Sequence, residues 1–557
     1  MNKKLLYALL SLCTLGTITG CSSNEPQNIS EVKTVATETE KTAAPAEDVA
    51  QEMTFVLSNL PDGLDPGITN NSFSKYVLFN AFEGLVTYDQ NGSLVPGLAN
   101  DWSISEDGRT YTFNLRPDLK WSDGTPLTAS DFVYSILRVA TPETTAQYVN
   151  MVTDYIVNAQ EYYEGKIDAE EVGVKAVDDS TLEITIKEPL SYYIDILSMW
   201  VYSPVQQATV EANGEAWSTK AETYVSNGPF KVTEMSMSEN VVLEKNENYW
   251  NAENVQLEKI NFRYILDTST ALTAYETGEV DGIVSIPSTD YARLRAEDKG
   301  VKSYPSYGTV FHLINNAKAP YDNPKVREAL NLALDRQLII DNVIQVDAQP
   351  AYSFLSPGYK VDGVDITDDR GTFGMSPSAE IEKAQQALAD AGYPNGEDFP
   401  ALELSYYSDD TVKKVVEAMA QMWETNLNID VEITSNEWVL FYESVQAGDY
   451  DVAAMGWSAD YFHPMSFMPL LKTGDSTNTS WYSNPEYDAL VDQIRAESDP
   501  NKVAELVQQA DIMVSSDYPM VPLYYKSNNI LLHDHIQGVH MNASAALFFK
   551  DAYVVGE

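Results

Sequence analysis

The sequence predicts a large protein of mixed α/β class that contains two or more domains. Segments with the apolar spacing of helices alternate along the chain with segments in which apolar and polar residues alternate as in strands. The 557 residues, of which 44% are hydrophobic and 11% aromatic, can form more than one core. No unit of roughly 20 to 50 residues repeats, which argues against a solenoid.

The first 20 residues have the layout of a secretory signal peptide. Two lysines precede a mainly apolar stretch over residues 5–18, and Ile18-Thr19-Gly20 lead into Cys21. The stretch is shorter than the ~20 residues of a membrane-spanning helix. We therefore expect cleavage before Cys21, lipidation of its side chain, and a mature protein tethered outside the cell. An ordinary signal peptide followed by a chance cysteine is the alternative.

Cysteine content indicates whether disulfides can form, and charge limits the classes of ligand and partner. The only other cysteine, Cys13, lies in the segment that would be removed, so the mature chain is expected to have no disulfide. The formal charge of −48 arises from 83 acidic and 35 basic residues spread along the chain. Such a surface repels phosphate, which excludes nucleic acid as a partner and favours neutral or cationic ligands. Simple solvation of an extracellular surface explains the charge equally.

Residues 21–51 are predicted to form a disordered tether. From Ser22 to Gln51 the chain is rich in Ser, Thr, Glu, Ala and Pro and has almost no large apolar residue. Such a composition cannot bury enough apolar surface to fold. The segment is expected to hold the folded part away from the membrane.

The folded part is expected to begin with a strand at Met53, followed by turn signals at Leu60-Pro-Asp-Gly. The helix over 129–139 is expected to be capped by Thr128 or Ser130, and the helix over 381–391 to end at Gly392. The remaining clear elements are helices over 326–344 and 412–427 and strands over 181–187 and 429–434.

Signatures of catalysis are missing from the sequence. It has no Gly-x-Ser-x-Gly elbow, Walker loop, His-Glu-x-x-His motif or cysteine nucleophile. His533 and His535 would share one face of a strand without a third metal ligand, and the acidic run from Asp362 to Asp369 does not match a calcium loop. We therefore expect no enzymatic activity, no catalytic residue, no cofactor and no metal.

Aromatic residues beside turn residues suggest a ligand pocket in the last third of the chain. Such side chains offer a large contact area at a low entropy cost. Core packing is the alternative role for each of them. The residues are Trp438, Trp457, Tyr461, Phe462, Trp481 and Tyr482.

Several segments that occur in a fixed order resemble family 5 of the extracellular solute-binding proteins, and within it the oligopeptide-binding lipoproteins of ATP-driven peptide importers. The resemblance extends from about Met53 to Tyr553. The segments that carry it begin with Phe82-Glu-Gly-Leu-Val, Leu98-Ala-Asn-Asp-Trp-Ser and Lys120-Trp-Ser-Asp-Gly-Thr-Pro-Leu-Thr. Further segments are Ser226-Asn-Gly-Pro-Phe-Lys-Val, Asn246-Glu-Asn-Tyr-Trp, Ala319-Pro-Tyr-Asp-Asn-Pro-Lys-Val-Arg and Met455-Gly-Trp-Ser-Ala-Asp-Tyr.

This resemblance implies a two-lobed periplasmic-binding-protein-like fold of class II, or cluster C, with an extra inserted domain and a hinge between the lobes. Lobes that offer strand edges can bind an extended peptide by backbone pairing and close over it. The expected parts are a signal peptide at 1–20, a tether at 21–51, lobe I at 52–82, 208–308 and 527–557, the extra domain at 83–207, and lobe II at 309–526.

The resemblance also implies a set of ligand-binding residues. Asp460 would pair with the peptide α-amino group, Gly456, Trp457 and Ser458 would form the strand that pairs with the ligand, and Asn70 to Ser72 would lie across the cleft. Tyr148 would contact the peptide and Trp438 would line a side-chain pocket. Phe311 stands where relatives can have a tyrosine. A turn or cap for Asp460, core packing for Trp438 and an ordinary loop for Asn70 to Ser72 are the alternatives.

The chain departs from the family at the peptide C-terminus. Some relatives hold the C-terminal carboxylate with a basic residue, but the aligned positions are the uncharged Val412, Ala454 and Ile344. Either longer peptides bind with a free C-terminus, or a residue such as Lys413 or Lys360 replaces the missing charge. A disulfide of some relatives is also absent, because Gly308 and Ser458 occupy its places.

From these features we expect a monomeric, lipid-anchored protein on the outer face of the cell membrane of a Gram-positive bacterium. It would deliver oligopeptides to the permease of an ABC transporter. The alternatives of the same class are binding of dipeptides, nickel complexes or a peptide pheromone. A surface interaction protein or adhesin on the same fold is a further alternative.

Overall fold

The computed structural model describes residues 49–89, 93–361, 364–367, 371–497, 499–542 and 545–556. All of them belong to one compact unit, Pro45–Glu557. The predicted signal peptide, the lipidation of Cys21 and nearly all of the predicted tether therefore lie outside the described residues. Within the described part of the chain, no helix is both long enough and apolar enough to cross a membrane.

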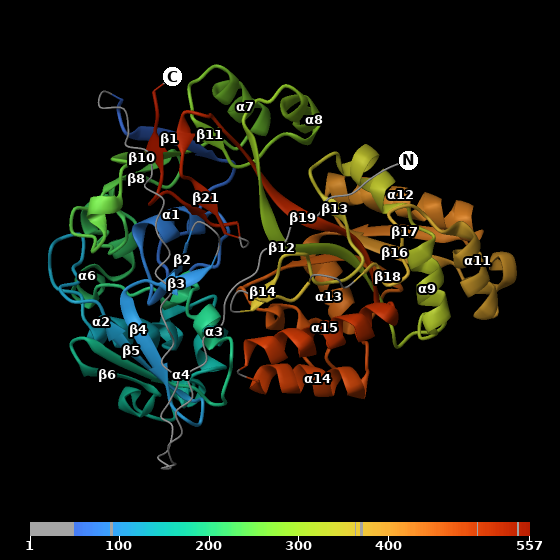
Figure 1. The fold of residues 1–557 in the computed structure, drawn as a ribbon, viewed down its shortest axis with the longest axis horizontal. Helices are drawn as coiled ribbons and strands as arrows, with labels where there is room; N and C mark the ends of the chain where they lie inside the picture. Colours follow the sequence, from blue (N-terminus) through green and yellow to red (C-terminus); the bar gives the residue numbers. More distant parts are fainter. Residues whose placement is uncertain are drawn as a thin grey trace, which may run out of the picture. The chain divides into compact units, whose positions relative to one another are not determined.

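One large mixed sheet runs through this unit (Figure 1). Its strands, in spatial order, are β17 (Val431–Asn436), β16 (Leu402–Tyr407), β18 (Val452–Ser458), β12 (Val301–Ile314), β19 (Met520–Leu532), β11 (Gly282–Ile283), β1 (Glu52–Leu57), β10 (Lys259–Tyr264), β9 (Asn240–Lys245) and β8 (Phe230–Ser236), with β13 (Gln349–Pro350) paired to β19. The observed mixture of sheet and helix confirms the predicted α/β class.

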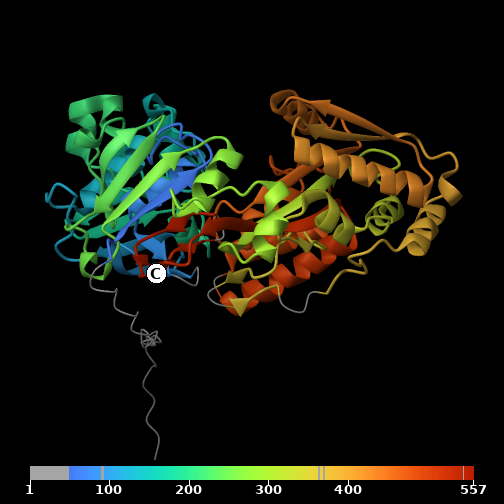
Figure 2. The same cartoon turned by 90° about the horizontal axis from the view of Figure 1, so that it is seen from above.

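Two long strands connect the two ends of this sheet. Antiparallel β12 and β19 pair with each other, and β19 contacts β11 at one end while β12 contacts β18 at the other. In Figure 2 the red strand β19 crosses the middle of the view. The pairing shifts register between Pro305 and Thr309, opposite Ser527 and Tyr525. The expected lobe boundaries at 308/309 and 526/527 fall at this irregularity.

Residues 83–207 carry a separate antiparallel sheet. Its strands, in spatial order, are β4 (Ala99–Ile104), β5 (Thr110–Leu115), β7 (Thr181–Thr185) and β6 (Val174–Asp178). Helix α2 (Ala129–Val139) has the predicted bounds, and the Asp131 carboxylate accepts a hydrogen bond from the Thr128 backbone N–H (2.8 Å), which caps the helix. Phe132 and Ile136, one helical turn apart, are both buried, as the apolar spacing predicts.

The remaining strands form pairs: β2 (Val86–Tyr88) with β3 (Leu94–Pro96), β14 (Lys360–Val361) with β15 (Val364–Asp365), β20 (Ile536–Gln537) with β23 (Tyr553–Val554), and β21 (His540–Met541) with β22 (Leu547–Phe548). The other α-helices in the first half are α1 (Ser74–Ala81), α3 (Asn150–Thr153), α4 (Ala159–Tyr163), α5 (Tyr193–Ile196), α6 (Gln207–Asn213), α7 (Thr268–Glu276) and α8 (Ser288–Ala296). Those of the second half are α9 (Pro324–Leu332), α10 (Arg336–Leu338), α11 (Ile381–Asp390), α12 (Asp410–Leu427), α13 (Trp438–Ala447), α14 (Pro485–Ala496) and α15 (Pro500–Ser516).

The single helix predicted over 326–344 is wrong, because the chain forms α9, α10 and a π-helical turn at Ile339–Ile344. Asp335 starts α10 by accepting a hydrogen bond from the Leu338 backbone N–H (2.7 Å). The fully buried Arg336 donates to the carbonyl oxygens of Asn331 (3.0 Å) and Pro522 (2.7 Å). These tertiary contacts favour a break that the apolar spacing alone does not predict.

Candidate functional site

Strand β18 has an edge that lacks a partner strand. On one side, Val452 to Ser458 pair with β12, with Ser458 opposite Gly308. On the other side, β16 pairs only with Val452 and Ala453. The backbone from Ala454 to Ser458 therefore has one edge that no described strand occupies. Such an edge presents backbone donors and acceptors to an incoming extended chain.

Trp457 and Ser458 add side-chain groups to this edge. The indole Nε1 of Trp457 is buried and has no hydrogen-bond partner among the described residues. A buried donor without an acceptor costs free energy, so it is a candidate for pairing with a ligand. Ser458 is exposed, and its Oγ accepts a hydrogen bond from Lys526 Nζ (3.1 Å).

Asp460 follows the edge by two residues. Its backbone N–H donates to Ser466 Oγ (2.9 Å), which fixes the turn after β18. Within the described part of the chain, its carboxylate has no hydrogen bond or ion pair. Burial raises the pKa of this carboxyl group to about 6. A desolvated carboxylate without a cation is a natural site for an ammonium group.

Tyrosine side chains surround Asp460, and one of them is the predicted Tyr148. Burial and, secondarily, the negative charge of Asp460 raise the pKa of the Tyr148 hydroxyl to about 12. Burial is also the main cause of the raised pKa of Tyr155 and Tyr359, and Asp460 adds to it in both. The structure thus brings Tyr148 close to Asp460, although more than 300 residues separate them in the sequence.

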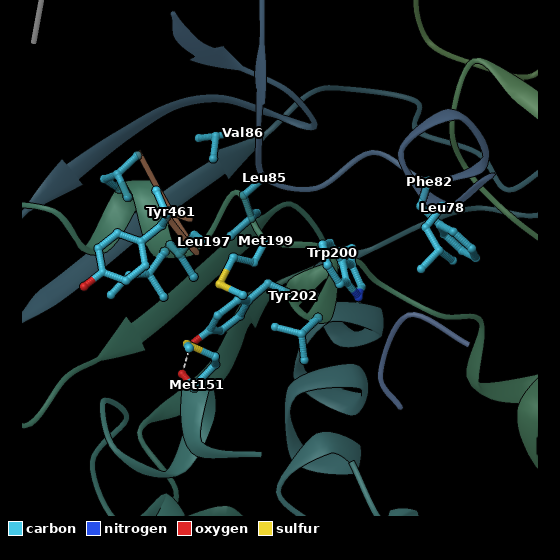
Figure 3. Packing of buried hydrophobic residues seen from close by; sticks show 14 of the residues in the cluster. Leu78, Phe82, Leu85, Val86, Met151, Leu197, Met199, Trp200, Tyr202 and Tyr461 are labelled. Carbon is cyan, nitrogen blue, oxygen red and sulfur yellow. Dashed lines mark hydrogen bonds between the residues drawn. The ribbon is translucent and has the colours of Figure 1, made fainter. Parts of the chain in front are cut away.

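The segment after Asp460 packs against the 83–207 part. The Tyr192 ring stacks on Tyr461 (centroids 5.6 Å apart, planes at 5°) and on His463 (4.7 Å, 15°). Figure 3 shows Tyr461 in the hydrophobic cluster that also contains Met199 and Trp200. These contacts fix the position of the turn that carries Asp460.

The predicted opposite wall, Asn70 to Ser72, is held beside Tyr148. The Gln147 backbone N–H donates to the Ile68 carbonyl (2.9 Å), and the Asn70 backbone N–H donates to Gln147 Oε1 (3.3 Å). Trp200 Nε1 donates to the Thr69 carbonyl (2.9 Å), and the Trp200 ring packs edge-on against Tyr148 at 5.6 Å. Asn70 and Ser72 themselves are exposed.

A buried ion pair anchors the chain just before this wall. Asp65, 5% exposed, accepts hydrogen bonds at Oδ1 from Arg138 Nη1 (2.9 Å) and at Oδ2 from Arg138 Nη2 (2.6 Å). The indole N–H of Trp217 (2.8 Å) and the Gly67 backbone N–H (3.0 Å) also donate to Asp65. This network ties residues 65–67 to α2, and therefore positions the wall.

The remaining predicted contacts lie in different surroundings. Trp438 is 49% exposed, stacks on Tyr442 (5.4 Å, 11°) and is not a core residue. Phe311 is 2% exposed and belongs to the hydrophobic core, so its role as a ligand contact stays a prediction. Ala454 and Ile344 are buried in a second apolar cluster, against which Val412 packs.

The sequence interpretation missed four residues at this site: Tyr155, Tyr192, Tyr359 and Lys526. Nothing in the local sequence marks the three tyrosines, because their partners lie far along the chain. Lys526 could have been noticed as an isolated cation within the apolar run that becomes β19. His533 and His535, the histidine pair considered above as metal ligands, contact Tyr275 and Asp281 respectively. The described residues contain no group of three or more potential metal ligands.

Comparisons with known proteins identify the family of the chain. Residues 93–479 match the family model described as bacterial extracellular solute-binding proteins, family 5 middle. The chain is 33% identical over 502 residues to the oligopeptide-binding protein OppA of Bacillus subtilis (strain 168), covering 88% of this chain and 91% of that protein.

Solved structures give the same result. The unliganded open form of the periplasmic murein tripeptide binding protein MppA matches with a TM-score of 0.82 at 31% identity, covering 92% of this chain and 98% of that one. Haemophilus influenzae OppA in complex with RPPGFSPFR matches with a TM-score of 0.71 at 32% identity, covering 92% and 100%.

The fold and the unoccupied strand edge therefore define a solute-binding protein. The family match over residues 93–479 and the identity to relatives over most of their length identify the family of solute-binding proteins to which the chain belongs. The chain belongs to family 5 of the bacterial extracellular solute-binding proteins.

Proposed function

We propose that this protein captures oligopeptides in extended conformation and delivers them to an ABC importer. One observation carries the proposal: the free edge of β18 over Ala454 to Ser458 leads directly to the half-buried carboxylate of Asp460, which has no partner among the described residues. The edge would pair with the peptide backbone, and Asp460 would bind the α-ammonium group. Backbone pairing reads no side chains, which suits a binder of varied peptides.

The opposite wall and the aromatic side chains complete the proposed site. Asn70 to Ser72 would contact the other edge of the peptide, Tyr148 would pack beside its first residue, and Trp438 would line a pocket for a side chain. Trp457 Nε1 would donate to the ligand. The family membership and the peptide-binding activity of OppA from Bacillus subtilis support this assignment.

We place the hinge of the proposed two lobes where β12 and β19 change register, at 305–309 and 525–527. Lobe I would comprise 52–82, 208–308 and 527–557, the extra domain 83–207, and lobe II 309–526. A register irregularity bends a strand pair more readily than a regular ladder, which suits a hinge.

The proposed location is the outer face of the cell membrane. The N-terminal sequence supports export, cleavage before Cys21 and attachment by a lipid on that cysteine. The protein would act as a monomer, perform no chemistry, and meet the permease subunits of the transporter. Release of palmitate or another acyl chain from the N-terminal peptide would establish the anchor by mass spectrometry.

The pH dependence of binding tests the role of Asp460. The carboxyl group of the free protein has a pKa of about 6, and only its ionised form attracts an ammonium group. Affinity for a free-amine peptide is therefore expected to be highest near pH 7, to fall by up to about tenfold per unit below pH 6, and to fall again from about pH 8, where the α-amino group of the peptide loses its proton. Calorimetric titration from pH 4.5 to 8 measures this profile. A profile that is flat across pH 6, or that Asp460→Asn retains, contradicts the proposal.

A further inference from the structure

Lys526 is a cation without a matching anion beside the proposed peptide edge. Among the described residues, its only polar contact is the hydrogen bond from Nζ to Ser458 Oγ (3.1 Å), and no carboxylate pairs with it. Burial lowers the pKa of this ammonium group, so its charge is only weakly compensated by solvent. In a chain with 83 acidic residues, a desolvated lysine without an acidic partner is unexpected.

The strand register explains how this side chain reaches the edge. Lys526 lies on β19 between Tyr525 and Ser527, opposite the irregular stretch of β12 that ends at Gly308. Gly308 lies between Lys526 and Ser458, and a Cβ at Gly308 would come within 3.0 Å of both Lys526 Cδ and Ser458 Oγ. Because Gly308 has no side chain, the lysine can cross β12 and place its ammonium group beside β18.

The position of the ammonium group defines which part of a ligand it can meet. Ser458 precedes Asp460 by two residues, or about 7 Å of extended chain. A peptide that pairs with β18 places a side chain roughly 5 Å from the one it faces, on the same side of the sheet. A carboxylate carried by one of the first three ligand residues can therefore reach Lys526.

We propose that Lys526 binds a carboxylate within the first three residues of the ligand, so that the site favours peptides with a negative charge close to their amino terminus. This inference rests on the proposed function. The carboxylate can belong to an acidic side chain or to the C-terminus of a dipeptide or tripeptide. Because the protein carries a net charge of −48, an anionic ligand group needs such a local cation.

The test is calorimetry on the full chain with pentapeptides of alanine, amidated at the C-terminus, that carry glutamate or glutamine at position 1, 2 or 3. The wild type is expected to prefer the glutamate peptide at one of these positions by about fivefold or more. Lys526→Met should abolish this preference, and Lys526→Arg should keep it. Gly308→Ala should weaken it, because the new methyl group displaces the lysine stem.

Lys383→Met is the matched control. Lys383 also lies in the second half of the chain, but it is exposed and faces Glu380 at 2.7 Å. Its loss changes the net charge equally and should leave the preference unchanged. A second series compares dipeptides and tripeptides as free acids and amides. If Lys526→Met removes the preference for free acids over amides in this series but does not change the glutamate series, the C-terminus is the source of the carboxylate and the proposal stands.

If neither preference depends on Lys526 while peptides still bind, the inference is wrong and the proposed function remains. If the wild type binds no peptide at all, both are overturned.

Discussion

Asp460→Ala is expected to weaken binding of free-amine peptides by at least about tenfold, or ~1.5 kcal/mol. The carboxylate is half-buried and has no cationic partner in the described part of the chain, so an ammonium group of the ligand would meet a preorganised, partly desolvated anion. Isothermal titration calorimetry at pH 7.5, where the wild-type group is ionised, measures the change.

Two controls make this result specific. Acetylation of the peptide amino group should lower the affinity for the wild type. It should lower the affinity for Asp460→Ala only slightly, because that variant has already lost the pair between carboxylate and ammonium group. Asp449→Ala, which removes an exposed carboxylate shortly before β18, should bind as the wild type does. Equal binding of free and acetylated peptides to the wild type would remove the amine anchor from the mechanism.

The ionised Asp460 carboxylate should also lower the free energy of unfolding of the ligand-free protein. The folded-state pKa of about 6 lies above the usual aspartate value of 3.8, so the folded protein binds the proton more tightly than the unfolded chain. The stabilising effect of this proton is complete below pH 3.8 and is lost as the pH rises through 6. Asp460→Asn should therefore be at least as stable as the wild type at pH 7.5, measured by urea unfolding without ligand. Marked destabilisation of this variant would mean that the carboxylate has a structural partner.

Asp65→Ala is expected to destabilise the protein by about 3–5 kcal/mol. It removes the partner of the Arg138 guanidinium, whose side chain is 13% exposed, and leaves that charge buried without compensation. It also leaves the Trp217 indole and the Gly67 backbone N–H without their acceptor. Urea unfolding monitored by tryptophan fluorescence measures the change.

A surface ion pair provides the comparison. Glu279→Ala breaks the contact with Arg263 (2.8 Å). The side chains of Arg263 and Glu279 are 35% and 59% exposed, so the free energy of unfolding should change by less than about 1 kcal/mol. A change of this small size in Asp65→Ala would show that the network does not anchor the 65–72 segment.

Local patterns predicted the elements whose signals are complete within a few residues. Helix α2 matches its predicted bounds because a capping residue and an apolar stripe occur together, and α11 ends before Gly392, whose φ of +102° suits glycine. The break between α9 and α10 was not predicted, because the buried Arg336 binds a carbonyl oxygen from β19, almost 190 residues away.

The candidate site was predictable from the family resemblance but not from the pattern of the residues. Asp460 and Tyr148 come together only through folding, and the stack of Tyr192 on Tyr461 joins segments separated by more than 260 residues. The proposed role of Lys526 depends on the missing side chain of Gly308, beside which the lysine stem passes, and this contact appears only once β12, β18 and β19 are aligned. Strand register between distant segments is the information that local sequence lacks.

The structure and the family together support binding of peptides by their backbone and free amino terminus. Native mass spectrometry of the compact unit Pro45–Glu557 with a library of peptides of graded length tests it most directly. We expect one-to-one complexes with many free-amine peptides and few complexes with the same library after N-acetylation. A protein that stays empty across the free-amine library would show that it does not bind peptides in this way.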